Sequence, residues 1–530
     1  MIKKIMLPTV LLTCVLSACS ERSKQTMRVV YNQNAQVEAL NEVPNIQFDS
    51  LRTSELKEEV QLFYKNNNYH LGWSNVDNRQ QLLASIDNLK LDGIKISAKE
   101  ITNLIELNTG YDQLDEAKKI QADFLYSTMY VNTLDHLYNG KLKAKRIYGD
   151  WEITPKPLNT SATMLLALEH KSIGLTYDSI RTKQPIYTHL RDKLSVYYTL
   201  DKDSLKPFKQ GKLNDTIPEL VAVKKHLIFL NQLADSIEAD AIYNKATAQS
   251  IKAFQTSKKI NATGFTDKKT IEAILQEENA LKEKIIVNLE RWRWFPREFS
   301  SNYILVNIPA YSLVSVTNQD TIQQHKVVVG TAARKTPILS STLTTVVLNP
   351  TWTVPPTIKK NDLVPKASND RSYFTRLNFT IYNSQGKVVS PENWDASKGT
   401  SYRYVQKGGQ GNTLGRVKFM FKNNHAVYLH DTPSKWGFAR NDRNLSSGCV
   451  RVQDPFDLTS YIFTQAGTNL TKEEVEKIIA SQETKSISVS ETPIDVHLLY
   501  WTVQVDNHGK FTYFKDIYKY DDDLYKRLAQ

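Results

Sequence analysis

The chain has 530 residues, of which 41% are hydrophobic and 23% are charged, with 19 Gly and 18 Pro. This composition excludes a disordered or fibrous protein, and the length allows two to four globular domains. The formal net charge of +12 would suit a nucleic-acid partner, but the basic residues are interspersed with acidic ones rather than gathered in a stripe. We therefore expect no nucleic acid, and a surface that is solvated or attracts anionic peptides or lipids.

The N-terminus has the features of an export signal. Residues 1–18 begin with two lysines close to the start, continue with an apolar run, and end at Leu16-Ser17-Ala18, directly before Cys19. This pattern is typical of a bacterial lipoprotein signal peptide, with an ordinary uncleaved anchor as the alternative. We expect Cys19 to be lipidated, residues 19–45 to form a polar tether, and the protein to be held to a membrane by this lipid on the periplasmic side of the cell envelope.

Helical periodicity dominates residues 46–215, which we expect to form a helical scaffold domain. Apolar residues recur near helix spacing, as in Leu56, Val60 and Phe63. The histidines of this region are scattered without the spacing of metal ligands, so no metal is expected there.

A small helical unit is expected at residues 217–278. Ile251 and Phe254 lie on one helical face, a turn follows at 261–264, and Asp267 can cap a second helix. The Phe-Gln pair that begins at Phe254 and the glycine-containing turn resemble the peptidoglycan-binding domain of cell-wall hydrolases. A purely structural helical module is the alternative.

Residues 285–530 contain runs of β-branched and aromatic residues broken by turn residues, which predicts a β-sandwich-like domain. The predicted fold class is therefore α+β and multidomain. The glycine-rich stretch 408–411 lacks the preceding strand and the lysine of a phosphate-binding loop, so no nucleotide is expected. Asp454 should cap a helix that begins at Pro455, and a hairpin from 497 to 514 should complete the sheet.

Cys14 and Cys19 belong to the N-terminal export segment, with Cys19 expected to carry the lipid, so Cys449 is the only thiol in the body of the chain and no disulfide can form within it. Such a thiol is either a buried small hydrophobe or a nucleophile. The alternation of residues 426–430 predicts a strand with Tyr428 and His430 on one face, and Gly448 allows a close backbone approach beside the sulfur. His430 can serve as the base that a cysteine nucleophile needs, although a purely structural pair could have the same spacing.

The sequence around these residues resembles a known family. Residues 430–433 (HDTP) and 446–452 (SSGCVRV) are similar to the active-site signature of the L,D-transpeptidases, the cysteine enzymes that cross-link peptidoglycan. Residues 291–294 (RWRW) and 348–356 (LNPTWTVPP) are similar to the large branch with an N-terminal scaffold. The resemblance implies acyl transfer without a cofactor: Cys449 attacks the third residue of a peptidoglycan stem tetrapeptide, the terminal D-alanine leaves, and the side-chain amine of another stem's third residue takes the acyl group.

Other residues near the cysteine are candidates for supporting roles. Backbone amides of Gly448 and Cys449 are the expected oxyanion donors. Arg451 should hold a substrate carboxylate or organise the site, with bracing of the loop as the alternative. Tyr428 should orient the histidine or line the cleft, with core packing as the alternative, and Ser447 should shape the backbone. Two rival functions stay open: an L,D-carboxypeptidase that trims stems, and a wall-binding lipoprotein without activity.

Residues 358–407 form an insertion that is too long for an ordinary connection. Residues 377–381 alternate, residues 383–386 turn and residues 388–389 return, which predicts a hairpin. The family resemblance implies a capping element at this place. We expect the insert to cover the Cys449 cleft and to exclude water that would compete with the acceptor amine. A peripheral decoration is the alternative.

Overall fold

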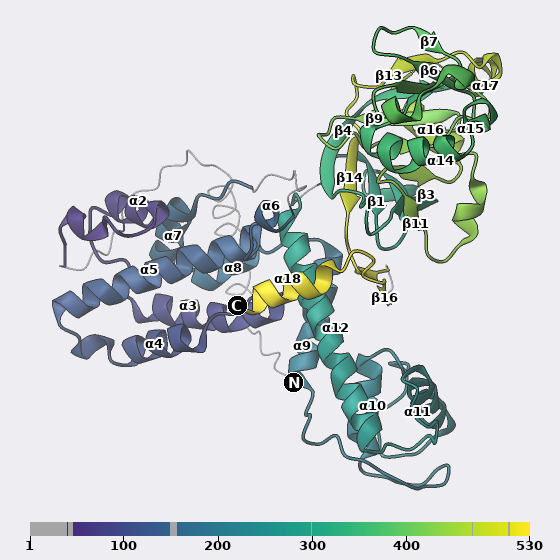
Figure 1. Cartoon of the computed structure of the whole chain (residues 1–530). Helices are drawn as coiled ribbons and strands as arrows, with labels where there is room; N and C mark the ends of the chain where they lie inside the picture. The colour runs from purple at the N-terminus through teal and green to yellow at the C-terminus, as the bar shows by residue number, and fades with distance from the viewer. Residues whose placement is uncertain (1–39, 41–45, 149–155, 298, 469, 507–508) are drawn as a thin grey trace, which may run out of the picture.

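The computed structural model describes residues 40, 46–148, 156–297, 299–468, 470–506 and 509–530. The expectations for residues 1–18, for Cys19 and for most of the tether lie outside this part of the chain. Helices and a β-rich domain are separated along the sequence (Figure 1). The fold class is therefore α+β and multidomain, as the sequence predicts.

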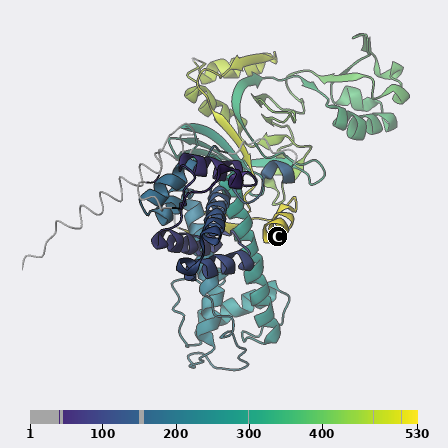
Figure 2. The same ribbon diagram turned by 90° about the vertical axis from the view of Figure 1, so that its left-hand side faces the viewer.

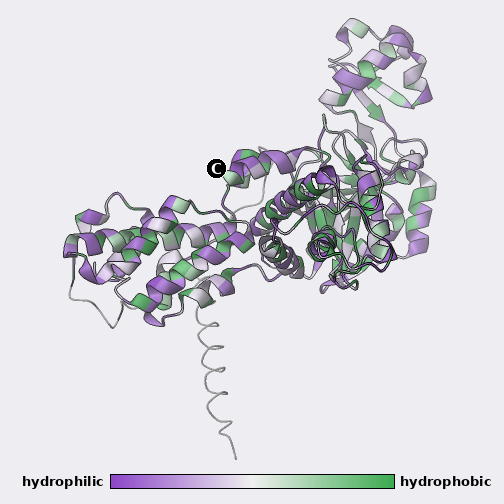
Figure 3. Ribbon diagram, turned by 90° about the horizontal axis from the view of Figure 1, so that it is seen from below, coloured by the Kyte–Doolittle hydropathy of each residue, from purple (hydrophilic) through white to green (hydrophobic). Residues whose placement is uncertain are grey.

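Most of the N-terminal helices surround a hydrophobic core of their own, whereas Tyr187 and Leu194 pack in the core shared with the small helical unit and the β-domain. Figure 3 shows that hydrophobic and hydrophilic residues alternate along them, and the apolar side is buried, as for Val60 and Phe63. Asn75, Ser97 and Asp115 each accept a hydrogen bond from the first turn of a helix and so fix where it begins. The helices are α2 (Glu58–Asn66), α3 (Val76–Asn88), α4 (Ala98–Thr109), α5 (Glu116–Asn139), α6 (Ala144–Ile147), α7 (Thr160–Glu169), α8 (Ile173–Ile180) and α9 (Pro185–Thr199), with 3-10 turns at Ser50–Thr53, Leu89–Asp92 and Tyr111–Gln113.

The small helical unit consists of α10 (Leu220–Phe229), α11 (Lys245–Ser257) and the first part of α12 (Lys268–Trp294). Asp267 caps α12 by accepting a hydrogen bond from the Thr270 amide at 2.8 Å, which confirms the predicted helix start. The helix then continues far beyond the small unit, over 27 residues in all. Figure 1 shows that this single helix joins the small unit to the β-domain.

The end of α12 is the junction of the domains. Arg291 pairs with Asp521 of the C-terminal helix α18 (Tyr520–Ala529) at 2.6 Å, and both side chains are buried. Trp294 donates from Nε1 to the carbonyl oxygen of Leu142 in the N-terminal domain at 3.1 Å. Two residues within one turn of a single helix therefore bind two separate parts of the chain.

The β-domain is built on one large sheet that closes on itself. Strand β3 pairs with β2 through its first half and with β12 near its end, and β4 pairs in the same way with β14 and then with β9. These two shared strands fold the sheet into a sandwich-like form. Its strands are β1 (Asn302–Asn307), β2 (Ser312–Thr317), β3 (Asp320–Gly330), β4 (Leu339–Leu348), β9 (Val417–Phe421), β10 (Leu429–His430), β11 (Asn444–Ser446), β12 (Val450–Val452), β13 (Lys485–Ser488) and β14 (Asp495–Leu499), and the helices α16 (Pro455–Gln465) and α17 (Lys472–Ser481) follow β12.

The insert is a separate lobe with its own four-stranded sheet (Figure 2), and its hydrophobic core also includes Leu414 and Tyr428 of the β-domain. The pairing of Ile381 with Val389 confirms the predicted hairpin. The strands, in spatial order, are β5 (Trp352–Thr353), β8 (Arg403–Gln406), β6 (Phe379–Tyr382) and β7 (Val388–Val389), and the helical segments are α13 (Pro356–Ile358), a π-helical turn (Lys359–Leu363), α14 (Val364–Asn369), α15 (Ser372–Arg376) and 3-10 turns at Pro391–Asn393 and Ala396–Lys398.

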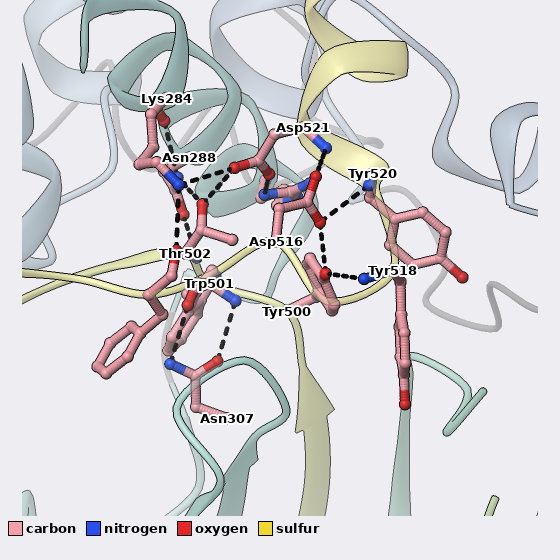
Figure 4. Close-up of polar contacts among 12 residues, drawn as sticks. Lys284, Asn288, Asn307, Tyr500, Trp501, Thr502, Asp516, Tyr518, Tyr520 and Asp521 are labelled. Atoms are coloured by element: carbon pink, nitrogen blue, oxygen red, sulfur yellow. Dashed lines mark hydrogen bonds and ion pairs between the residues drawn. The ribbon is translucent and has the colours of Figure 1, made fainter. Parts of the chain in front are cut away.

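The prediction that a hairpin from 497 to 514 completes the sheet is wrong in its second half. Strand β14 joins the main sheet, but β15 (Val503–Val505) and β16 (Phe511–Tyr513) pair only with each other. The chain leaves the main sheet because Trp501 stacks on Trp292 of α12, with ring centroids 3.8 Å apart, and because Asn307 bonds both backbone groups of Trp501 at 3.0 Å (Figure 4). Alternation along a strand does not reveal such contacts with a distant helix.

None of the helices in the described part of the chain is both long and apolar enough to cross a membrane.

Candidate active site

A short parallel pairing brings the candidate residues together. Leu429 of β10 pairs with Val450 of β12, and His430 pairs with Arg451. Because paired residues of neighbouring strands point to the same side, the buried Leu429 and Val450 face the core, and the flanking residues face the other side of the sheet. His430 and Cys449, nineteen positions apart in the sequence, thereby become diagonal neighbours on one face.

This face opens into a cavity of about 870 Å³. All the predicted site residues that the structure describes line it, namely Tyr428, His430, Ser447, Gly448, Cys449 and Arg451. The other walls come from the loop 331–337 after β3 and from the insert. The remaining predicted residue, Cys19, lies outside the described residues.

His430 is buried, with 4% of its surface exposed. Its Nδ1 contacts the backbone carbonyl oxygen of Asp431, which can only accept, so Nδ1 carries a hydrogen. Burial, with a smaller contribution from the positive charge of Arg451, lowers the pKa of His430 to about 3. The imidazole is therefore neutral at neutral pH and can accept a proton.

The neighbour that orients His430 is itself held in place. The Asp431 carboxylate accepts hydrogen bonds from the Arg416 amide at 2.9 Å and from Lys435 Nζ at 2.6 Å. A Cβ at Gly415 would lie only 2.3 Å from Asp431 Oδ2, so only glycine leaves room for this carboxylate. The backbone carbonyl that fixes the imidazole is thus anchored to the segment before β9.

Cys449 is partly buried and carries the free thiol of the site. Burial raises the pKa of this thiol above its ordinary value. Hydrogen bonds from the backbone and hydroxyl of Tyr428 act in the opposite direction, as do the charges of Lys418 and Arg451, but they do not overcome burial. The resting site therefore holds a neutral thiol near a neutral imidazole.

The turn that presents Cys449 is built around Ser446. Its hydroxyl accepts from the Gly448 amide at 3.2 Å and donates to the Cys449 carbonyl oxygen at 2.6 Å. Gly448 has a φ of +118°, which residues with a side chain rarely adopt. Of the two amides expected to bind an oxyanion, that of Gly448 is therefore engaged, and that of Cys449 has no acceptor within the described part of the chain.

An ion pair joins the insert to this turn. Arg334 Nη1 and Nη2 contact the Asp362 carboxylate of the insert at 2.5 and 3.1 Å, and Nη1 also donates to Ser447 Oγ at 2.9 Å. Both charged side chains are about one third exposed or less. The insert is thus tied directly to the residue two positions before Cys449.

The cavity is basic. Its walls carry Arg334, Lys335, Lys366 and Arg451, against the single carboxylate of Asp362. Arg451 lines this cavity, and its Nε is buried and has no hydrogen-bond partner among the described residues. Its guanidinium is of the type that binds carboxylates. In the same part of the chain no cluster of His, Cys, Asp or Glu could hold a metal ion.

Two local predictions at the site need correction. The strand expected at 426–430 shrinks to Leu429–His430, because Ala426 has a φ of +52° that breaks the extended backbone. Tyr428 and His430 still share a face, with ring centroids 5.6 Å apart. Asp454 does not cap its helix through its side chain but adopts a left-handed conformation, although the helix begins at Pro455 as predicted.

Three residues of the site escaped the sequence analysis. Lys418 pairs in register with His430 from strand β9, and its Nζ lies 4.0 Å from the ring centroid of Tyr428. In the alternating run 417–421 this lysine looks like an ordinary solvated position. Arg334 and Thr336 belong to the loop after β3, where nothing in the sequence relates them to Cys449.

Family models match three parts of the chain. They are the L,D-transpeptidase catalytic domain at residues 301–471, a scaffold domain at residues 58–194, and a "Putative peptidoglycan binding domain" at residues 216–274. A protein of Haemophilus influenzae named "Putative L,D-transpeptidase" is 34% identical over 376 residues, which cover 68% of this chain and 70% of that protein.

Solved structures give weaker similarities. The L,D-transpeptidase from Mycobacterium smegmatis has a TM-score of 0.20 and 11% identity, over 38% of this chain and 58% of that one. An L,D-transpeptidase from Xylanimonas cellulosilytica (residues 123-326) has a TM-score of 0.17 and 13% identity, over 56% of this chain and 100% of that one.

The sandwich-like domain, with a histidine and a lone cysteine on one face of its sheet, is thus of the L,D-transpeptidase class. The chain belongs to the L,D-transpeptidase family, in a form that adds a scaffold domain and a peptidoglycan-binding domain. The matched domains belong to families associated with peptidoglycan, which indicates a location in the cell envelope.

The charge state of the site predicts how the thiol reacts with pH. Iodoacetamide should alkylate Cys449 at a rate that rises with an apparent pKa above the ordinary cysteine value of about 8.5. Burial raises the thiol pKa, and His430 stays neutral until about pH 3, so no imidazolium stabilises a thiolate. The rate would be measured from about pH 5 to about pH 10 by mass spectrometry of the Cys449 peptide, with N-acetylcysteine as the reference thiol. A rate that stays constant down to about pH 5 would indicate a thiolate–imidazolium pair and contradict this prediction.

Proposed function

We propose that this protein cross-links peptidoglycan by acyl transfer through Cys449. The observation that supports it most directly is the shared face of β10 and β12, on which the thiol and a neutral, oriented imidazole line one cavity in a chain of the L,D-transpeptidase family. The substrate would be a tetrapeptide stem, and the acceptor would be the side-chain amine at the third residue of another stem.

In the first half-reaction, Cys449 Sγ attacks the carbonyl carbon of the third stem residue while His430 Nε2 takes the thiol proton. The bond to the terminal D-alanine then breaks, His430 returns the proton to the departing amine, and a thioester remains on Cys449. In the second half-reaction the acceptor amine attacks the thioester and gives its proton to His430. The bond between the acyl carbon and Cys449 Sγ breaks as the new amide forms, and His430 returns its proton to the sulfur, which restores the thiol.

A resting neutral pair suits this sequence, because the proton moves only when the sulfur attacks. The hydroxyl of Tyr428 and the charge of Lys418 would stabilise the sulfur as negative charge develops on it. Arg451, with a buried and unpartnered Nε, would bind a stem carboxylate. Ser447 would hold the turn through its bond to Arg334.

Purified tetrapeptide muropeptides test this function. Wild-type protein should give cross-linked dimers and free D-alanine, detected by mass spectrometry. Cys449→Ser and His430→Ala should each lower turnover by at least about 10³-fold, because each removes a member of one reacting unit. His189→Ala is a matched control, because this histidine lies on α9 and does not line the cavity.

Each other outcome has a defined meaning. Tripeptides without dimers would make the protein an L,D-carboxypeptidase, and no product at all would favour a wall-binding protein without activity. Substantial turnover by Cys449→Ser would show that the nucleophile is assigned wrongly.

We also propose that the insert acts as a lid over the Cys449 cleft. It supplies one wall of the cavity, and the Arg334–Asp362 ion pair ties it to the turn that presents Cys449. Water competes with the acceptor amine for the thioester, so a closed insert favours cross-linking over hydrolysis.

Asp362→Asn should therefore raise the ratio of tripeptides to dimers by about two- to fivefold, the range expected for a partly exposed ion pair. Asp370→Asn is the matched control, because Asp370 pairs with Arg376 within the insert. Replacing residues 358–407 by a Gly-Ser linker should shift the ratio further. An unchanged ratio in a folded Asp362→Asn variant and in the linker variant would refute the lid.

Finally, we propose that lipid on Cys19 holds the protein to a membrane and that residues 217–278 bind the wall. The motif before Cys19 supports the first point, and the match to a peptidoglycan-binding domain supports the second. Cys19→Ala should move the protein from the membrane fraction to the soluble envelope fraction, as followed by immunoblotting. Persistence of that variant in the membrane fraction would exclude the lipid anchor.

A further inference from the structure

We infer that Thr336 is a positioning residue that aims the amide N–H of Cys449 at the oxyanion of the reaction. This inference rests on the proposed acyl transfer. Thr336 follows β3, is 1% exposed, and is absent from the lining of the cavity. It can act on the reaction only through the backbone that it contacts.

The hydroxyl of Thr336 bridges two backbone groups. Its Oγ1 accepts from the Gly330 amide at 2.8 Å and donates to the Gly448 carbonyl oxygen at 2.8 Å. A hydroxyl has one hydrogen to donate, and the Gly330 amide occupies an acceptor position. The proton of Thr336 is therefore committed to Gly448.

This contact sets the orientation of the next peptide group. In a trans peptide the carbonyl oxygen and the following N–H lie in one plane and point in opposite directions. Holding the Gly448 carbonyl toward Thr336 therefore directs the Cys449 N–H away from Thr336. That N–H is the one without an acceptor in the described chain, whereas the Gly448 N–H is bonded to Ser446.

Gly448 makes such an external restraint necessary. Its φ of +118° provides the turn, but a glycine also allows its peptide groups to rotate more freely than other residues do. A Cβ at this position would meet Lys335 O at 3.4 Å, an ordinary contact, so the glycine is required by its conformation rather than by space. The Thr336 bond removes the freedom that this glycine introduces.

Thr336 is supported from behind by the C-terminal segment. The Tyr518 hydroxyl accepts from the Thr336 amide at 3.0 Å and donates to the Gly330 carbonyl oxygen at 2.8 Å. The Tyr518 amide in turn donates to the Tyr500 hydroxyl at 2.8 Å, and that hydroxyl donates to Asp516 at 2.5 Å (Figure 4). The loop that carries Thr336 is thus fixed by buried hydrogen bonds.

Two reactions of Cys449 distinguish a role of Thr336 in orienting the Cys449 amide from a general role in maintaining the site. Acyl transfer passes through an oxyanion and needs the aimed N–H. Alkylation by iodoacetamide is a displacement at carbon that needs the thiol and its base but no oxyanion donor. A defect confined to acyl transfer therefore reports on the orientation of the amide.

In the full-length chain, Thr336→Val should lower kcat for dimer formation by about 10- to 100-fold, less than or comparable to the loss of a whole oxyanion donor, with little change in KM. Its alkylation rate at Cys449 should stay within about twofold of wild type. Thr336→Ser, which keeps the hydroxyl, should restore most of kcat. Wild-type kcat in Thr336→Val, a parallel loss of alkylation, or equal defects in the serine and valine variants would each overturn the inference.

Tyr518→Phe provides a second test in case the Thr336→Val variant does not fold. It removes the support of Thr336 and should lower kcat several-fold while alkylation is unchanged; an unchanged kcat would overturn the inference in that case. The activity of the wild-type protein distinguishes a failure of the proposed acyl transfer from a failure of the proposed role of Thr336. No acyl transfer by wild type would refute the proposed function, whereas full activity in both wild type and Thr336→Val would refute only the role of Thr336.

Discussion

The parallel pairing of β10 with β12 is the constraint on which the candidate site depends. It consists of only two residue pairs, but β9 and β3 flank it on either side, so it lies inside the sheet rather than at an edge. Register has a period of two, and a shift by one residue would turn His430 or Cys449 into the core. The buried Leu429 and Val450 make that shift costly, because they would then be the residues exposed in the cavity.

Burial also sets the chemistry of the pair. It lowers the pKa of His430 and raises that of the Cys449 thiol, so both changes favour the uncharged form. The nearby charges of Lys418 and Arg451 favour a thiolate, and that of Arg451 also opposes an imidazolium. They therefore favour negative charge on the sulfur, while the resting site stays neutral.

Helix α12 connects the β-domain, which contains this site, to the rest of the molecule. It runs unbroken from the small helical unit to the β-domain, where Arg291 pairs with Asp521 and Trp292 stacks on Trp501. Removal of the Asp521 carboxylate would leave Arg291 buried without its partner. This would lower the free energy of unfolding by about 3–5 kcal/mol. The same C-terminal segment carries Tyr518, which supports the loop beside Cys449.

The sequence by itself determined those features of the protein that depend on residues close together in the chain. It identified the fold class, the cap at Asp267, the insert hairpin and the motif residues His430 and Cys449, because caps, turns and motifs depend on neighbours in the chain. Only the tertiary structure placed Lys418 and Thr336 at the candidate site, moved the last hairpin away from the sheet, and gave His430 and Cys449 surroundings that favour their neutral forms. These features depend on burial and on contacts between residues far apart in the chain, and no local pattern records either one.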